Sequence, residues 1–257
     1  MGPGFAMEHS LLAYVCIICG AAWLLRTLFT APRRYSVLVC YLTYYTVSPG
    51  VFWIARPLGL RMEYTLVSNV LGVALAVAAL LEIHNIVMER YIGFRKLGGV
   101  LMQVTIWASG VAVVALTFLV PPENLRGWSR MIPFQAANTH WALALVALSM
   151  AAFFIYFELR PSRNVKLYLA MFTIWFLTVA GVNTSVYQLG PETRDTIFLL
   201  RASVYIVLTI TGAIFFSKAG EHVPAYEPIG IAAEQEARGA LENMNEALLR
   251  VFKDQAD

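Results

Sequence analysis

Long apolar segments separated by short charged clusters run through most of this sequence. A helix needs about 20 residues to cross about 30 Å of hydrocarbon at 1.5 Å per residue, and windows of that length predict seven helices. Their expected ranges are 10–30, 36–55, 64–88, 98–120, 137–158, 166–188 and 197–217. The segments are continuously apolar and longer than the roughly 10 residues of a barrel strand, so their backbone hydrogen bonds should close within each segment. The pattern predicts an all-α polytopic membrane protein, a bundle of seven transmembrane helices.

The composition fits this class. Hydrophobic residues make up 59% of the 257 positions and charged residues 14%, whereas a soluble domain carries about 25% charged residues. The net charge of +3 comes without a basic, aromatic-interleaved patch, so nucleic-acid binding is not expected. The expected environment is the lipid bilayer.

The sequence divides into four parts. An N-terminal lead at 1–9 precedes the transmembrane domain at 10–218, and its Glu8 and lack of Lys or Arg argue against a signal peptide. A Pro- and Gly-rich linker follows at 219–230. At 231–257 apolar residues recur at three- and four-residue intervals, which predicts an amphipathic C-terminal helix. This helix is expected either to lie on the membrane surface or to dock on a partner subunit or a second copy of the chain.

Lys and Arg residues are unevenly divided between the two sets of loops, which predicts the orientation. One set, after helices 1, 3, 5 and 7, has nine: Arg33, Arg34, Arg90, Arg95, Lys96, Arg160, Arg163, Lys166 and Lys218. The opposite set has five: Arg56, Arg61, Arg126, Arg130 and Arg194. The N-terminus is therefore predicted outside and the C-terminus in the cytoplasm.

Two segments carry a family resemblance. "TAPRRYSVLVCYLTYYTV" joins a basic turn to a tyrosine-rich second helix, and "ALLEIHNIVMERYIGFRKLG" has an acidic residue near the end of the third. In these features the first half of the chain resembles a group of uncharacterised bacterial seven-helix integral membrane proteins. The resemblance implies the bacterial inner membrane as the location and implies no activity.

Two other seven-helix families do not fit. Microbial rhodopsins bind retinal on a lysine in the middle of helix 7, and no lysine of this chain lies at mid-depth in a helix. Glu89-Arg90-Tyr91 is similar to the E/DRY motif of rhodopsin-like receptors. However, no proline follows Trp175 in helix 6 and helix 7 has no NPxxY, so we interpret the match as coincidence.

No convergent catalytic or cofactor-binding set is evident, so an enzyme is not expected. Cys16 and Cys19 share a helix face without a cation near them in sequence, which favours inert thiols. His9 and His140 form the candidate pair at one depth for a haem, but both lie at helix ends, where solvated histidines are common, so haem is not expected. Metal-hydrolase, nucleophile-elbow and P-loop motifs are missing from the sequence.

Polar and aromatic residues concentrate in the outer halves of five helices, and polar groups at membrane depth face the bundle interior or a wet cavity. The candidate ligand-binding residues are Arg201, Tyr205, Tyr187, Asn183, Asn69, His140, Trp141 and Tyr45. In one interpretation Arg201 binds a carboxylate or phosphate of a small ligand or lipid. In the other it reaches the interface and pairs with Glu192 or Asp195 while the aromatic residues form an interfacial belt.

These alternatives lead to two functional hypotheses. The first is a receptor-like or accessory membrane module that binds a small ligand in an outer polar and aromatic cup and couples to partners through cytoplasmic loops and tail. The second is a structural or assembly subunit of a larger bacterial membrane complex.

A second polar cluster is expected at the cytoplasmic end of helix 3. Glu82, Asn85 and Glu89 share a face by their i, i+3, i+7 spacing. We expect this face to point into the bundle and Glu82 to pair with Arg26.

Overall fold

The structure is a computed structural model that describes residues 3–30, 34–55, 58–119, 128–189, 194–221 and Gly239. The chain divides into two compact units, Met1–His222 and Val223–Asp257, and the helices described below belong to the first. They are α1 (Pro3–Thr30), α2 (Ser36–Ala55), α3 (Arg61–Met88), α4 (Ile92–Leu119), α5 (Trp128–Tyr156), α6 (Arg163–Leu189), α7 (Arg194–Phe215) and the short 3₁₀ helix η3 (Lys218–Glu221).

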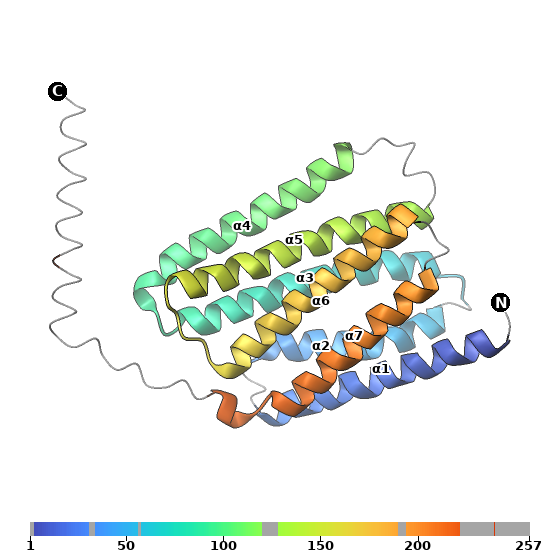
Figure 1. Ribbon diagram of the computed structural model, residues 1–257, viewed down its shortest axis with the longest axis horizontal. Coiled ribbons are helices and arrows are strands. Elements are labelled where there is room, and N and C mark those ends of the chain that lie inside the picture. The colour runs from blue at the N-terminus through green and yellow to red at the C-terminus, as the bar shows by residue number, and fades with distance from the viewer. Residues whose placement is uncertain are drawn as a thin grey trace. The chain divides into compact units, whose positions relative to one another are not determined.

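The predicted all-α fold with seven helices is confirmed for the described part of the chain, which contains no strand. Successive helices run antiparallel, and α7 returns beside α1 (Figure 1). We call one end of the bundle the Tyr35 end; it holds the α1–α2, α3–α4 and α5–α6 turns and η3. The opposite end is the Arg201 end.

Four helices are long and apolar enough to cross a membrane by length and composition. These candidate spans, found among the described residues, are Val67–Met88, Phe94–Leu116, Met131–Tyr156 and Arg163–Leu189. Two shorter apolar stretches, Tyr14–Thr30 and Leu199–Phe215, lie in α1 and α7. The four candidate spans therefore indicate a membrane protein.

Several helix ends differ from the apolar windows. α5 begins at Trp128 and α4 at Ile92, both earlier than expected, because the backbone stays helical beyond the apolar run. α1 begins at Pro3, so most of the expected lead is helical. Residues 219–221, assigned to the linker, belong to η3. The rest of the linker and the amphipathic tail helix lie outside the described residues, apart from Gly239.

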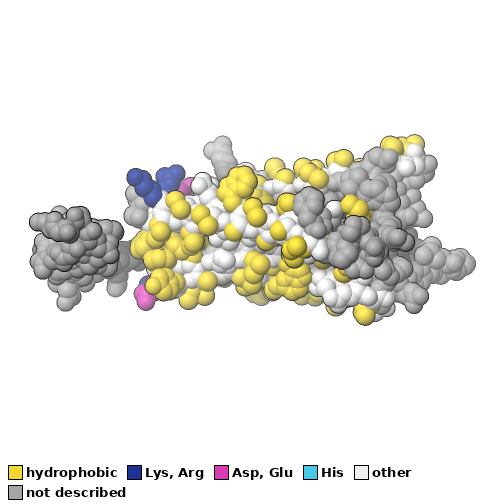
Figure 2. All heavy atoms as spheres, turned by 90° about the horizontal axis from the view of Figure 1, so that it is seen from above, with side chains coloured by type: hydrophobic (Ala, Val, Ile, Leu, Met, Phe, Trp, Pro, Cys, Tyr) yellow, Lys and Arg dark blue, Asp and Glu magenta, His cyan; other side chains and the backbone are white. Residues whose placement is uncertain are grey.

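The core lies along α6, which packs most extensively against α5 and also contacts α3 and α7. Tyr35, Ile83 and Val165 are fully buried in it. The outside is apolar as well: Trp107 is 75% exposed and Ile155 78%. Hydrophobic side chains extend along the visible face of the helices, and the coloured charged side chains gather at one end (Figure 2). An apolar exterior of this kind is what a bilayer requires.

Candidate functional site

Arg201 lies beside an aromatic cluster formed by α2, α6 and α7. Its guanidinium carbon is 5.4 Å from the ring centroid of Trp175, within cation–π range. The Trp175 ring also contacts Tyr205 edge-on at 5.4 Å and Tyr45 at 6.3 Å between centroids. Arg201 is partly exposed and forms no hydrogen bond or ion pair with the described residues. The cluster is therefore an aromatic wall of steeply tilted rings, with the Arg201 guanidinium over the ring of Trp175.

The phenols behind this wall are buried without hydrogen-bond partners. The hydroxyls of Tyr205 and Tyr41 have no hydrogen-bond partner among the described residues. Tyr205 comes this deep because Gly20 in α1 has no side chain: a Cβ there would lie 2.7 Å from the Tyr205 hydroxyl oxygen. Buried hydroxyls are normally hydrogen-bonded, so these phenols retain unused hydrogen-bonding capacity near Trp175.

Of the other predicted ligand residues, His140 lies within electrostatic range of Arg201, whereas Asn69 and Asn183 do not join this cluster. Asn69 is exposed on α3. Asn183 donates to the Val179 carbonyl at 2.8 Å, one turn back in its own helix. His140 contacts the Ala136 carbonyl through Nδ1 at 2.7 Å in the same way.

Trp141 and Tyr187 lie instead along the seam between α5 and α6. The Trp141 indole donates to Thr184 at 3.2 Å, and the Tyr187 ring packs 5.1 Å from Phe134. The structure thus brings together Arg201, Tyr205 and Tyr45 from the predicted set and adds Trp175 to them.

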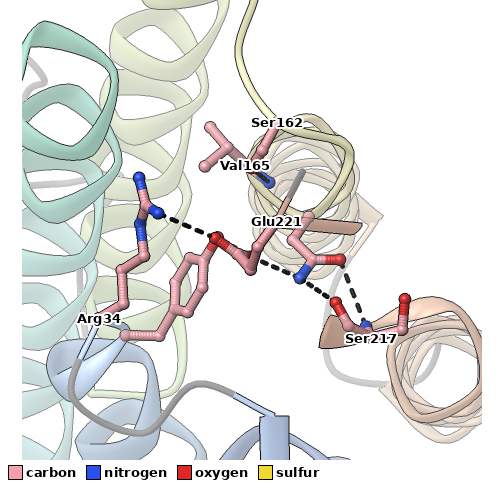
Figure 3. Close-up of polar contacts among 7 residues, drawn as sticks. Arg34, Ser162, Val165, Ser217 and Glu221 are labelled. Atoms are coloured by element: carbon pink, nitrogen blue, oxygen red, sulfur yellow. Dashed lines mark hydrogen bonds and ion pairs between the residues drawn. The ribbon is translucent and has the colours of Figure 1, made fainter. Parts of the chain in front are cut away.

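A separate polar cluster around Glu221, which sequence reasoning did not find, lies at the Tyr35 end (Figure 3). Glu221 of η3 accepts hydrogen bonds from the Tyr35 hydroxyl at 2.6 Å and from the Asn164 amide at 2.5 Å. Its other oxygen is 3.4 Å from Nη1 of Arg34. Burial and the neighbouring Glu221 raise the pKa of the Tyr35 phenol, so Tyr35 stays protonated and acts as the donor.

Asn164 also fastens the end of α7. Its amide donates to the Ser217 carbonyl at 2.8 Å, and its carbonyl oxygen accepts the Ser217 N–H at 3.3 Å. Arg163 donates to the Phe215 carbonyl and the Ser217 hydroxyl. These contacts join residues more than 50 positions apart, and the linker-like composition after Lys218 gave no signal for them. The cluster connects the start of α2, the start of α6 and the end of α7.

The predicted ion pair between Glu82 and Arg26 is not formed. The Glu82 carboxylate accepts the backbone N–H groups of Val37 at 2.7 Å and Leu38 at 3.0 Å, which are free donors in the first turn of α2. Arg26 donates through Nε to the Phe216 carbonyl just after α7 at 2.8 Å. The Glu82 carboxylate therefore binds the N-terminal end of α2, and the Arg26 guanidinium binds the C-terminal end of α7. At each of these ends the helix dipole has the opposite sign to the side chain.

The predicted inward face of α3 is also corrected. Asn85 and Glu89 are exposed, whereas His84, which directly precedes Asn85, is buried at 6% exposure. His84 Nδ1 lies 3.4 Å from the Asn85 side-chain oxygen, and its Nε2 has no hydrogen-bond partner among the described residues. Tyr91, the last residue of the E-R-Y triplet, accepts the Arg160 N–H at 2.8 Å. The triplet thus helps to join the α3–α4 and α5–α6 turns.

Neither cluster offers a metal centre. Across the described residues, no group of three His, Cys, Asp or Glu side chains is placed to hold a metal ion. Cys16 and Cys19 are partly buried, Cys40 is exposed, and all three are free thiols.

No protein-family model, no curated protein and no solved structure matches this chain. The likeness to bacterial seven-helix proteins therefore remains a resemblance, with which the helical, apolar architecture is compatible.

Proposed function

We propose that this chain is a receptor-like or accessory membrane module that binds a small ligand carrying a carboxylate or phosphate at the Arg201–Trp175–Tyr205 cluster. The observation that carries the proposal is the Arg201 guanidinium, 5.4 Å from the Trp175 ring and without a carboxylate partner in the described residues. A guanidinium presents paired donors that suit carboxylate and phosphate oxygens. Glu192 and Asp195, the alternative partners, have side chains outside the described part.

The surroundings of Arg201 suit such a ligand. Aromatic rings supply apolar walls, and the buried Tyr205 and Tyr41 hydroxyls behind them have no hydrogen-bond partner among the described residues. Ligand sites combine mostly apolar walls with a few polar groups in this way. A ligand with an anionic group and an apolar or ring-shaped body would use both features.

The proposal includes all seven helices as spans and places the Arg201 end outside. The Lys and Arg excess in the loops of the Tyr35 end supports this orientation by the positive-inside rule. On this orientation, ligand reaches Arg201 from outside the cell, and the loops of the Tyr35 end and the C-terminal tail face the cytoplasm, where they couple to partners.

A thermal-shift experiment on the purified full chain tests the proposal. The probes are inorganic phosphate, succinate and benzoate, which separate the anionic group from the ring. We expect at least one probe to raise the melting temperature of the native chain and not of Arg201→Gln. Arg160→Gln, at the exposed Tyr35 end, is the matched control and should respond like the native chain. Equal shifts in native and Arg201→Gln protein would contradict the proposal.

A further inference from the structure

α4 has a polar residue where a lipid-facing helix should have none. Gln103 lies in the candidate span Phe94–Leu116, about 3 Å from its middle at 1.5 Å per residue. Its side chain is exposed and forms no hydrogen bond with the described residues. An amide without partners is unfavourable in hydrocarbon. In a bilayer, Gln103 therefore needs a partner from outside the described part of the bundle.

This side of α4 carries two glycines beside Trp107, which is 75% exposed and lies about 40° around the helix from Gln103. At 100° per residue, Gly99, Gln103 and Gly110 fall within an arc of about 40°, and Val114 lies next to it. A Cβ added at Gly99 or at Gly110 would meet no atom within 4 Å. Only 6% of the span is buried inside the bundle, against 39–56% for the other three candidate spans. Small residues on an open face let another helix backbone approach closely, and amide side chains then bond across the contact.

We propose that this stripe, Gly99, Gln103, Gly110 and Val114, is the interface of a parallel homodimer in which α4 packs against α4 of a second copy. Two copies inserted in the same orientation are related by a twofold axis along the membrane normal. Each residue near that axis then faces its own counterpart at the same depth. A glutamine amide is both donor and acceptor, so Gln103 pairs with Gln103 of the second copy. A lipid tail offers no such partner.

Cysteine cross-linking in vesicles containing only this purified chain tests the interface without detergent. The background carries Ala in place of Cys16, Cys19 and Cys40, which are the free thiols of the chain. We expect Val114→Cys to form a disulfide-linked dimer under mild oxidation. Val104→Cys, exposed but about 100° around the helix from the centre of the stripe, should stay monomeric.

Two further substitutions, each combined with Val114→Cys, test the amide and the glycine contact. Gln103→Leu should weaken dimerisation about 3- to 30-fold, the range expected from interhelical hydrogen bonds in membranes. Gln188→Leu removes an exposed amide at the end of α6 and should leave the dimer unchanged. Gly110→Leu should also suppress the cross-link, and the open space at Gly110 allows the monomer to fold. Cross-linking at position 104 equal to that at 114, no cross-link at 114, or an unchanged yield in Gln103→Leu would overturn the proposal.

Discussion

The indole ring of Trp23 in α1 covers Gly212 in α7, and a Cβ on Gly212 would lie 2.5 Å from Cε2 of that ring. The two helices share the second most extensive helix contact of the bundle, after α5 with α6. About one turn earlier in α1, Gly20 makes room for Tyr205 of α7. The glycines thus set how closely α1 and α7 approach, and through Tyr205 they help to position the aromatic cluster.

Substitution of Gly212 tests this contact. Gly212→Ala should lower the free energy of unfolding by about 1–3 kcal/mol, because the added methyl forces the Trp23 ring or a helix to move. Gly181→Ala in α6 is the control, since a Cβ there meets no atom within 4 Å. It should be neutral or stabilising by up to about 1 kcal/mol through helix propensity. Thermal unfolding in one detergent compares the two, and equal losses would contradict the close contact.

Glu82 is expected to stabilise the protein through the start of α2. Glu82→Gln replaces one carboxylate oxygen by an NH₂ group that faces an N–H of Val37 or Leu38, and it removes the charge that favours a helix N-terminus. We expect a loss of about 1–3 kcal/mol in unfolding free energy. Glu89→Gln, at an exposed position at the end of the same helix, should have an effect within about 0.5 kcal/mol. The assignment fails if the two variants unfold at the same temperature.

The Tyr35–Glu221 hydrogen bond predicts a dependence on alkaline pH. Burial raises the pKa of the Tyr35 phenol in the folded protein above its ordinary value of 10.0. The stabilisation is therefore complete below about pH 10 and decreases above it, because the unfolded chain ionises first. Each further pH unit removes up to about 1.4 kcal/mol, until the pH reaches the folded pKa.

Tyr35→Phe isolates this effect. At pH 8 the native chain should be more stable than Tyr35→Phe by about 1 kcal/mol, the contribution of the lost hydrogen bond. Between pH 10 and pH 11 that difference should shrink and change sign. Tyr156→Phe, which removes an exposed phenol, is the control for the loss of a tyrosine hydroxyl that has no contact with Glu221. Parallel curves for native and Tyr35→Phe protein would mean that Tyr35 does not titrate as inferred.

The number of helices was predictable because an apolar run of membrane length leaves the backbone no alternative. Which face of each helix points inward was less predictable. α3 is apolar over most of its surface, so the sequence did not distinguish buried His84 from exposed Asn85 and Asn69. Periodicity identifies a buried face only where polar residues define the opposite one.

The two polar clusters show the same limit. Arg201, Tyr205 and Tyr45 were grouped by depth alone, and the structure brings them together around Trp175. The expected pair of Glu82 with Arg26 was wrong because opposite charges were matched while the free N–H and carbonyl groups at helix ends were left out. Asn164 and Glu221 are far apart in sequence and are brought together by the tertiary fold. No local sequence pattern reveals such a contact.

The central claim is that Arg201, Trp175 and Tyr205 hold a small anionic ligand, and a high-resolution density map of the purified chain in lipid tests it most directly. The account predicts density for a non-protein molecule against the Trp175 ring, with oxygen atoms within hydrogen-bond distance of the Arg201 guanidinium. A cluster closed by the protein's own side chains, with Arg201 paired to Glu192 or Asp195, would contradict it and favour a structural subunit.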